Sequence, residues 1–151
     1  METQDKTISL LNDLIKINND RIEGYEKAAK ETTEQEFKSI FGSMAQESQK
    51  YKNELIAEVT GLGGAPAEGT TTSGKVYRAW MDIKAALSGK DRKAILASCE
   101  FGEDAALEVY RDVLKSEEFA KRSREVVILQ QNNLQNAHDK IKLLRDNVKV
   151  L

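Results

Sequence analysis

The sequence predicts an all-α protein built from four long helices and one short one, and three observations lead to this fold class. Apolar residues recur every three or four positions over several long stretches, which is the spacing of one face of an α-helix. The 151 residues include one proline and nine glycines, so few residues interrupt those stretches. Hydrophobic residues make up 40% and charged residues 32%, which fits helices with one buried and one solvated face. We expect a single domain over residues 1–151.

Five helices are expected in order along this domain. Their predicted ranges are about 5–30, 33–60, 76–88, 91–115 and 117–149. The second begins at Thr33, where Thr-Glu-Gln-Glu has the form of a capping box. Ser73 and Ser116 are the predicted N-terminal caps of the short helix and of the last helix. Trp80 and Leu87 give the short helix an apolar face, so we expect both side chains to be mostly buried.

The lengths of the connections predict how the long helices are arranged. Almost no linker separates the first long helix from the second, or the third from the fourth, so each pair should form an antiparallel hairpin. Residues 61–73 form a glycine- and threonine-rich loop that can carry the chain back along the bundle. The second and third long helices then run parallel. This is the topology of a ferritin-like four-helix bundle, with the short helix in the crossover.

Two acidic residues stand inside the apolar stripes. Glu47 lies three residues after Met44 and four before Tyr51, and Glu103 lies four residues after Cys99. These spacings place each carboxylate on the same helix face as its apolar neighbours. Burying a carboxylate costs several kcal/mol unless a partner compensates its charge. We therefore expect each of these side chains to have a partner inside the bundle.

A polar layer is predicted at the middle of the bundle. Counting from each hairpin turn, at a rise of about 1.5 Å per residue, places four polar residues within roughly one helical turn of each other. They are Asn18, Glu47, Glu103 and Gln131. We expect these side chains to hydrogen-bond to one another, to Arg21 or Lys50, to a tyrosine hydroxyl or to trapped water. His138 follows about two turns further along.

Carboxylates in such a layer also suggest a metal site. A di-iron carboxylate bundle takes one Glu from each of two helices and a Glu-x-x-His from each of the other two. Here Lys50 stands where the first histidine should be, and the neutral Asn18 lies at the matching level of the first helix. Glu47, Glu103 and His138 remain as candidate metal ligands, with iron or manganese as the candidate ion. The preferred interpretation of all three is structural.

Several segments together resemble one family. They are LNDLIKINNDRIEGYEKA at 11–28, SQKYKNEL at 48–55 and ASCEFGEDAALEVYRDVL at 97–114, with SGKVYRAWMDIKAAL and QNAHDKIKLLRD. The chain is similar over residues 10–146 to a bacterial ferritin-like four-helix-bundle family that is catalogued as a domain of unknown function. The resemblance implies a ferritin-like bundle in a small cytoplasmic protein linked to stress responses, with no established activity.

Composition excludes several classes of function. The net charge of −2 favours neither nucleic acid nor an anionic membrane as a partner. No run of about 18 apolar residues predicts a membrane span, and no signal peptide is visible. The single cysteine, Cys99, cannot form an internal disulfide, which favours the cytoplasm. With one histidine in the chain, no Ser/His/Asp constellation is convincing.

Two functions remain open at this point. The preferred one is a non-enzymatic structural or interaction protein that self-associates through its helix faces and needs no cofactor. The alternative is a carboxylate-bridged metal-binding protein with iron-handling or oxidase activity. Bound metal at the centre of the bundle would distinguish them.

Overall fold

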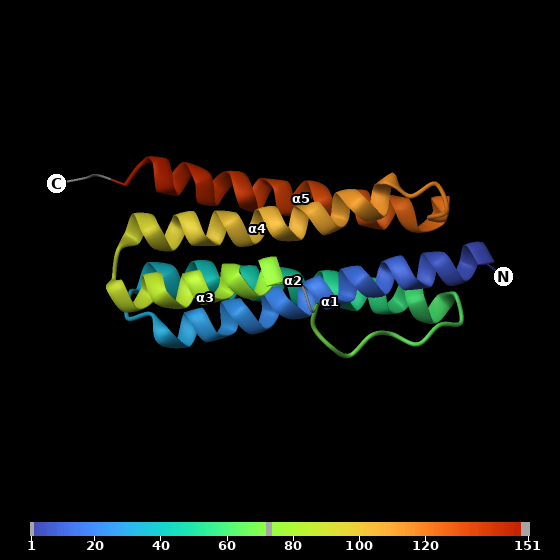
Figure 1. Ribbon diagram of the computed structural model, residues 1–151, viewed down its shortest axis with the longest axis horizontal. Helices are drawn as coiled ribbons and strands as arrows, with labels where there is room; N and C mark the ends of the chain where they lie inside the picture. Colours follow the sequence, from blue (N-terminus) through green and yellow to red (C-terminus); the bar gives the residue numbers. More distant parts are fainter. Residues whose placement is uncertain (1, 72–73, 149–151) are drawn as a thin grey trace.

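The computed structural model describes residues 2–71 and 74–148, which form a helical bundle (Figure 1). Its five helices are α1 (Glu2–Glu31), α2 (Gln35–Gly61), α3 (Gly74–Gly89), α4 (Arg92–Lys115) and α5 (Lys121–Asp146). No strand occurs within these described residues. The all-α fold class is therefore confirmed.

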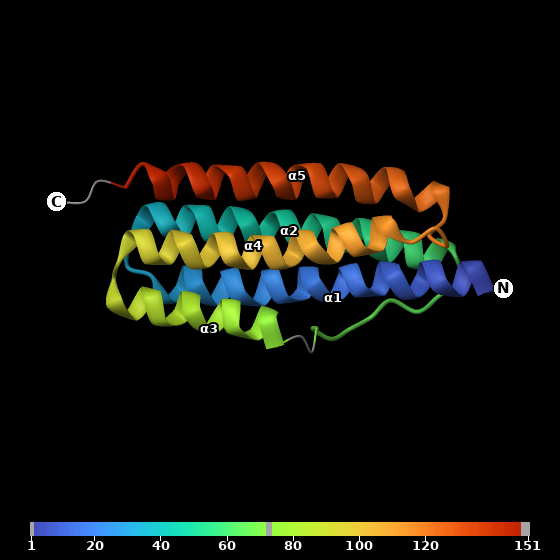
Figure 2. The same ribbon diagram turned by 45° about the horizontal axis from the view of Figure 1, so that its top comes forward.

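The four long helices pair as two antiparallel hairpins. α1 packs mainly against α2, and α4 packs mainly against α5. Contacts between α1 and α4, and between α2 and α5, close the bundle. Figures 1 and 2 show that α2 and α4 run in the same direction, with α1 and α5 opposed to them. The connection after α2 returns beside α1 before α3 begins (Figure 2).

Side chains of α1 hold this returning segment in place. Asn12 donates to the carbonyl of Ala65 and accepts from the amide of Ala67. Two helical turns further along, Asn19 donates to the carbonyl of Gly69 at 2.9 Å. Each bond satisfies a backbone group that has no partner in a regular element. The polar face of α1 thus fixes where α3 begins.

The short helix α3 covers α1 and α4 along one half of the bundle (Figure 2). Val76 and Ile83 are buried there, and Trp80 and Leu87 are mostly buried, as expected, with a part of each still exposed. Both side chains pack on the core. The expected cap at Ser73 lies outside the described residues.

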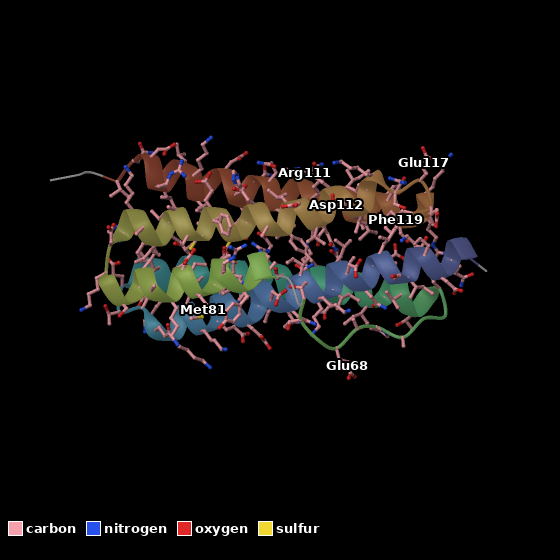
Figure 3. All side chains as sticks on the ribbon, in the orientation of Figure 1. Glu68, Met81, Arg111, Asp112, Glu117 and Phe119 are labelled. Carbon is pink, nitrogen blue, oxygen red and sulfur yellow. The ribbon has the colours of Figure 1, made fainter. Side chains whose placement is uncertain are left out.

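The predicted helix caps at Thr33 and Ser116 are wrong. Thr33 is exposed, and it is the neighbouring Thr32 whose hydroxyl accepts from the amide of Glu34. Ser116 ends α4 instead of starting α5, because the chain first makes a turn that buries Phe119 (Figure 3). The buried Thr7 fixes this turn, since its hydroxyl accepts from the amide of Ala120 at 3.0 Å.

The core consists of two apolar clusters. One lies around Leu14, Leu55 and Tyr110. The other lies around Phe37, Phe41 and Ile95 and includes the single cysteine. The polar residues at the centre of the bundle lie between the two clusters. On α1, α2 and α4, respectively, Arg21, Ser48 and Glu103 separate the residues of one cluster from those of the other. Among the described helices, none combines the length and the apolar character needed to cross a lipid bilayer.

Candidate functional site

The centre of the bundle holds a buried ion pair between α1 and α4. Arg21 is 1% exposed and Glu103 is fully buried. The guanidinium donates from Nε to Oε2 of Glu103 at 2.9 Å and from Nη2 to Oε1 at 2.5 Å. This two-point geometry is the strong form of an arginine–carboxylate contact. The expectation that Glu103 pairs with a buried partner is confirmed, and that partner is Arg21.

The remaining donors of Arg21 reach α2. Its Nη1 donates to the hydroxyl of Ser48 at 2.5 Å, and Nη2 lies 3.5 Å from the sulfur of Met44. Tyr25 lies one turn further along α1, with its ring centre 5.5 Å from the guanidinium carbon. Burial, followed by the charge of Glu103, raises the pKa of this tyrosine well above its usual value. Arg21 therefore links three helices around one charge.

Glu47 takes a peripheral position next to this centre. Its Oε1 lies 3.7 Å from Nη1 of Arg21, and 31% of its side chain is exposed. Burial raises the pKa of Glu47, while the charge of Arg21 and a bond from the Tyr51 hydroxyl oppose the shift. A neighbouring pocket of about 360 Å³ between α2 and α5 is lined by Glu47, Lys50 and Lys140. Ser48, one residue further along α2, takes the inward position expected for Glu47.

A second set of polar side chains extends from this centre toward the α2–α5 side. Asn18 donates to the Tyr110 hydroxyl at 2.9 Å, and that hydroxyl donates to Gln130 at 2.7 Å. Gln130 in turn donates to the side chain of Glu54 at 3.1 Å. The buried amide of α5 is thus Gln130, and the prediction of Gln131 is wrong by one residue. The polar layer itself is present.

The third predicted ligand, His138, lies in a different place. Its Nε2 is 2.8 Å from Oδ1 of Asp104 and 3.6 Å from Oε1 of Glu100. Glu47 and Glu103 contact Arg21 instead. The structure therefore brings two of the three predicted residues to the guanidinium and places His138 among other carboxylates.

Sequence reasoning did not find Ser48, Gln130, Glu100 or Asp104. The last two carry a usable signal, because acidic residues four positions apart lie on one face of a helix. Their position beside His138 depends on the rotation of α5 about its axis. Spacing within α5 does not fix that rotation to within one residue, as the burial of Gln130 in place of Gln131 shows.

Comparison with known families identifies the chain. Residues 6–116 match the family described as Domain of unknown function (DUF2383). The chain belongs to this family. The match confirms the resemblance to a family of unknown function that the sequence motifs suggested. It runs from the second turn of α1 to the end of α4. No curated protein matches the chain. Arg21, Ser48 and Glu103 all lie inside the DUF2383 match, whereas His138 lies beyond it.

The chemical consequence of this site follows from its charges. Both oxygens of Glu103 accept from the guanidinium, so a metal ion at Glu103 would have to displace Arg21. Displacement would leave a buried cation without its partner, which is strongly unfavourable. The arrangement suits the joining of helices better than the binding of a central cation.

Proposed function

We propose that this DUF2383 chain is a ferritin-like bundle in which the Arg21 guanidinium takes the central position of a metal ion. It acts as a non-enzymatic structural or interaction protein in the cytoplasm. The observation that carries this proposal is the two-point contact between Arg21 and Glu103 at the middle of the bundle. The two antiparallel hairpins and the returning segment before α3 support the ferritin-like relationship.

Self-association is the proposed mode of interaction, and α3 supplies the surface. Tyr77 is 67% exposed and Met81, one turn further along, is 46% exposed. Beside them, α1 and α3 form a groove of about 300 Å³ with Trp80 in its wall. Large apolar side chains next to a groove are typical of contact surfaces.

The proposed occupant of this groove is a second copy of the chain. Its lining includes three acidic residues, Asp20, Glu23 and Glu31, and two basic ones, Lys27 and Lys84. A surface that carries both signs can complement itself across a two-fold axis, where each patch meets its own copy. Tyr77 of each copy would then enter the groove of the other.

Sedimentation of the full chain tests this proposal. We expect the parent to be a dimer, and Met81→Glu to shift the chain toward the monomer because it places a charge in the contact. Leu143→Glu is the matched control, since Leu143 is 63% exposed on α5. A monomeric parent, or a loss of the dimer in the control alone, would overturn the proposed surface.

A separate measurement tests the metal-free centre. The melting temperature is recorded with and without iron(II) or manganese for the parent and for Glu47→Gln. We expect any metal-dependent increase to be the same in both chains, because the centre contributes no ligands. An increase that disappears in Glu47→Gln, or rapid oxidation of iron(II) by the parent alone, would support the alternative metalloprotein.

A further inference from the structure

A cluster of metal-ligating side chains lies at the interface of α4 and α5, separate from the Arg21 centre. Glu100 and Asp104 are one turn apart on α4, and the antiparallel α5 brings His138 against them. One ligand atom from each of the three lies within 4.8 Å of the others. The imidazole Nε2 contacts both carboxylates, at 2.8 Å from Asp104 and 3.6 Å from Glu100. We propose that these three residues bind a single divalent transition-metal ion.

The second ring nitrogen of His138 is already oriented for this role. Its Nδ1 lies 3.1 Å from Oδ1 of Asp139, and Gln135 donates to the same oxygen at 2.9 Å. A metal-bound histidine usually donates its other N–H to a carboxylate, which fixes the tautomer and the plane of the ring. Asp139 supplies that carboxylate. Nε2 is thereby left as the nitrogen that faces the two acidic ligands.

The exposure of the cluster allows an ion to enter from solvent. Only 12% of the His138 side chain and 15% of Glu100 are exposed, whereas Asp104 is 50% exposed. The ion is therefore held against the helices on one side and open on the Asp104 side, where water molecules complete its coordination. All three ligands project from regular helices, so binding requires rotamer adjustments and no change of fold.

The donor set selects the kind of ion. Imidazole nitrogen suits zinc, iron, nickel and copper, whereas a site for magnesium or calcium is built from oxygen ligands alone. One histidine and two carboxylates with open positions match the sites of zinc and of divalent iron or manganese. Zn²⁺ is the appropriate probe, because it has no redox chemistry and tolerates several geometries.

Arg145 limits the strength of the site. Its Nη1 bonds to Oε2 of Glu100 and its Nη2 lies 3.0 Å from Asp146. The guanidinium leaves Oε1 of Glu100 facing His138, but its positive charge repels a bound cation. Removing this charge should therefore strengthen metal binding. If the metal only adsorbed nonspecifically to acidic residues, a change at this single position would not have that effect.

Calorimetric titration of the full chain with ZnCl₂ tests the site. We expect one Zn²⁺ per chain, at least tenfold weaker binding in Asp104→Asn and in His138→Gln, and binding about threefold tighter in Arg145→Gln. Glu47→Gln is the matched control, because it removes one carboxylate of α2 that is not among the three proposed ligands. Its affinity for Zn²⁺ should equal that of the parent.

Asp104→Asn keeps the test independent of folding, since Asp104 is half exposed. Circular dichroism without metal checks that each variant has the parent fold. A parent Kd weaker than about 1 mM, or unchanged affinity in Asp104→Asn, would overturn the proposal. Loss of binding in Glu47→Gln would overturn it as well, and would move the metal to the centre of the bundle.

Discussion

The indole of Trp80 occupies the space that a side chain at position 24 would need. A Cβ built on Gly24 would lie 2.3 Å from Cε3 of Trp80, which is far inside van der Waals contact. The same indole meets the ring of Tyr25 edge-on, with the ring centres 5.0 Å apart. Gly24 therefore permits α3 to dock on α1, although glycine disfavours a helix interior.

Gly24→Ala should destabilise the protein by about 1–3 kcal/mol, because the overpacking at Trp80 outweighs the gain in helix propensity. Urea denaturation measures the change. Trp80 is the sole tryptophan, so a red shift of its emission would report the displacement of α3.

Gly102→Ala is the matched control on α4. A Cβ there would lie 3.9 Å from the Cβ of Ala79, an ordinary contact. We expect this variant to be as stable as the parent or more stable by up to about 1 kcal/mol, without a change in emission. Equal destabilisation by both substitutions would contradict the role of Gly24.

The Arg21–Glu103 pair should show strong energetic coupling. Arg21→Met and Glu103→Leu should each destabilise by about 3–5 kcal/mol, because each leaves a buried charge unpaired. The double variant should cost less than either single one, since no unpaired charge remains. A double-mutant cycle by urea denaturation measures the coupling. Simple addition of the two single costs would show that the contact carries no net interaction.

Glu47 should lower stability at neutral pH. Burial raises the pKa of Glu47 in the folded chain. At pH values between the ordinary carboxyl pKa and this raised pKa, the folded state therefore binds more protons than the unfolded state. Stability from this group is present below that window and declines as the pH rises through it. Glu47→Gln should therefore be more stable than the parent at pH 7, with the difference vanishing in acid.

Thermal melts of the parent and Glu47→Gln across the acidic to neutral range measure this effect. Asp139→Asn is an informative contrast, because its hydrogen bond from His138 lowers the pKa of Asp139. Its effect on the pH profile should have the opposite sign. A Glu47→Gln difference that grows toward low pH would refute the interpretation.

Cys99 should not react in the folded protein. Its side chain is fully buried, and burial raises the pKa of the thiol well above its usual value. Alkylation by iodoacetamide should occur only as fast as the bundle opens, and should increase when urea unfolds the chain. Labelling at the rate of a free thiol in native buffer would contradict the position of Cys99 in the core.

The sequence predicted best where a helix has a clear start and an uninterrupted stripe. Asp91 caps α4 by accepting from the amide of Ala94, and Ile95, Cys99 and Glu103 are all buried as expected. The start of α5 was placed too early, at Ser116, and Gln131 was expected in the buried position that Gln130 takes. The turn that buries Phe119 is a tertiary contact, and local propensity does not reveal it.

The candidate site was predicted only in part, and the reason is related. A helix stripe is wide enough to include both Glu47 and Ser48, and periodicity does not decide which one turns inward. The position of Arg21 decides it, because the guanidinium binds Glu103 and reaches Ser48 with its remaining donor. The spacing of apolar residues within one helix does not reveal which side chains of three different helices contact one another.

The division of the core into two clusters has a consequence for how this family can vary. Leu14 and Leu55 belong to one cluster, and Phe41 and Ile95 belong to the other. Substitutions without shared neighbours change stability independently, so the two ends of the bundle can accumulate changes without compensating for each other. Arg21 and Glu103 cannot vary independently, because a substitution of one leaves the other as an unpaired buried charge.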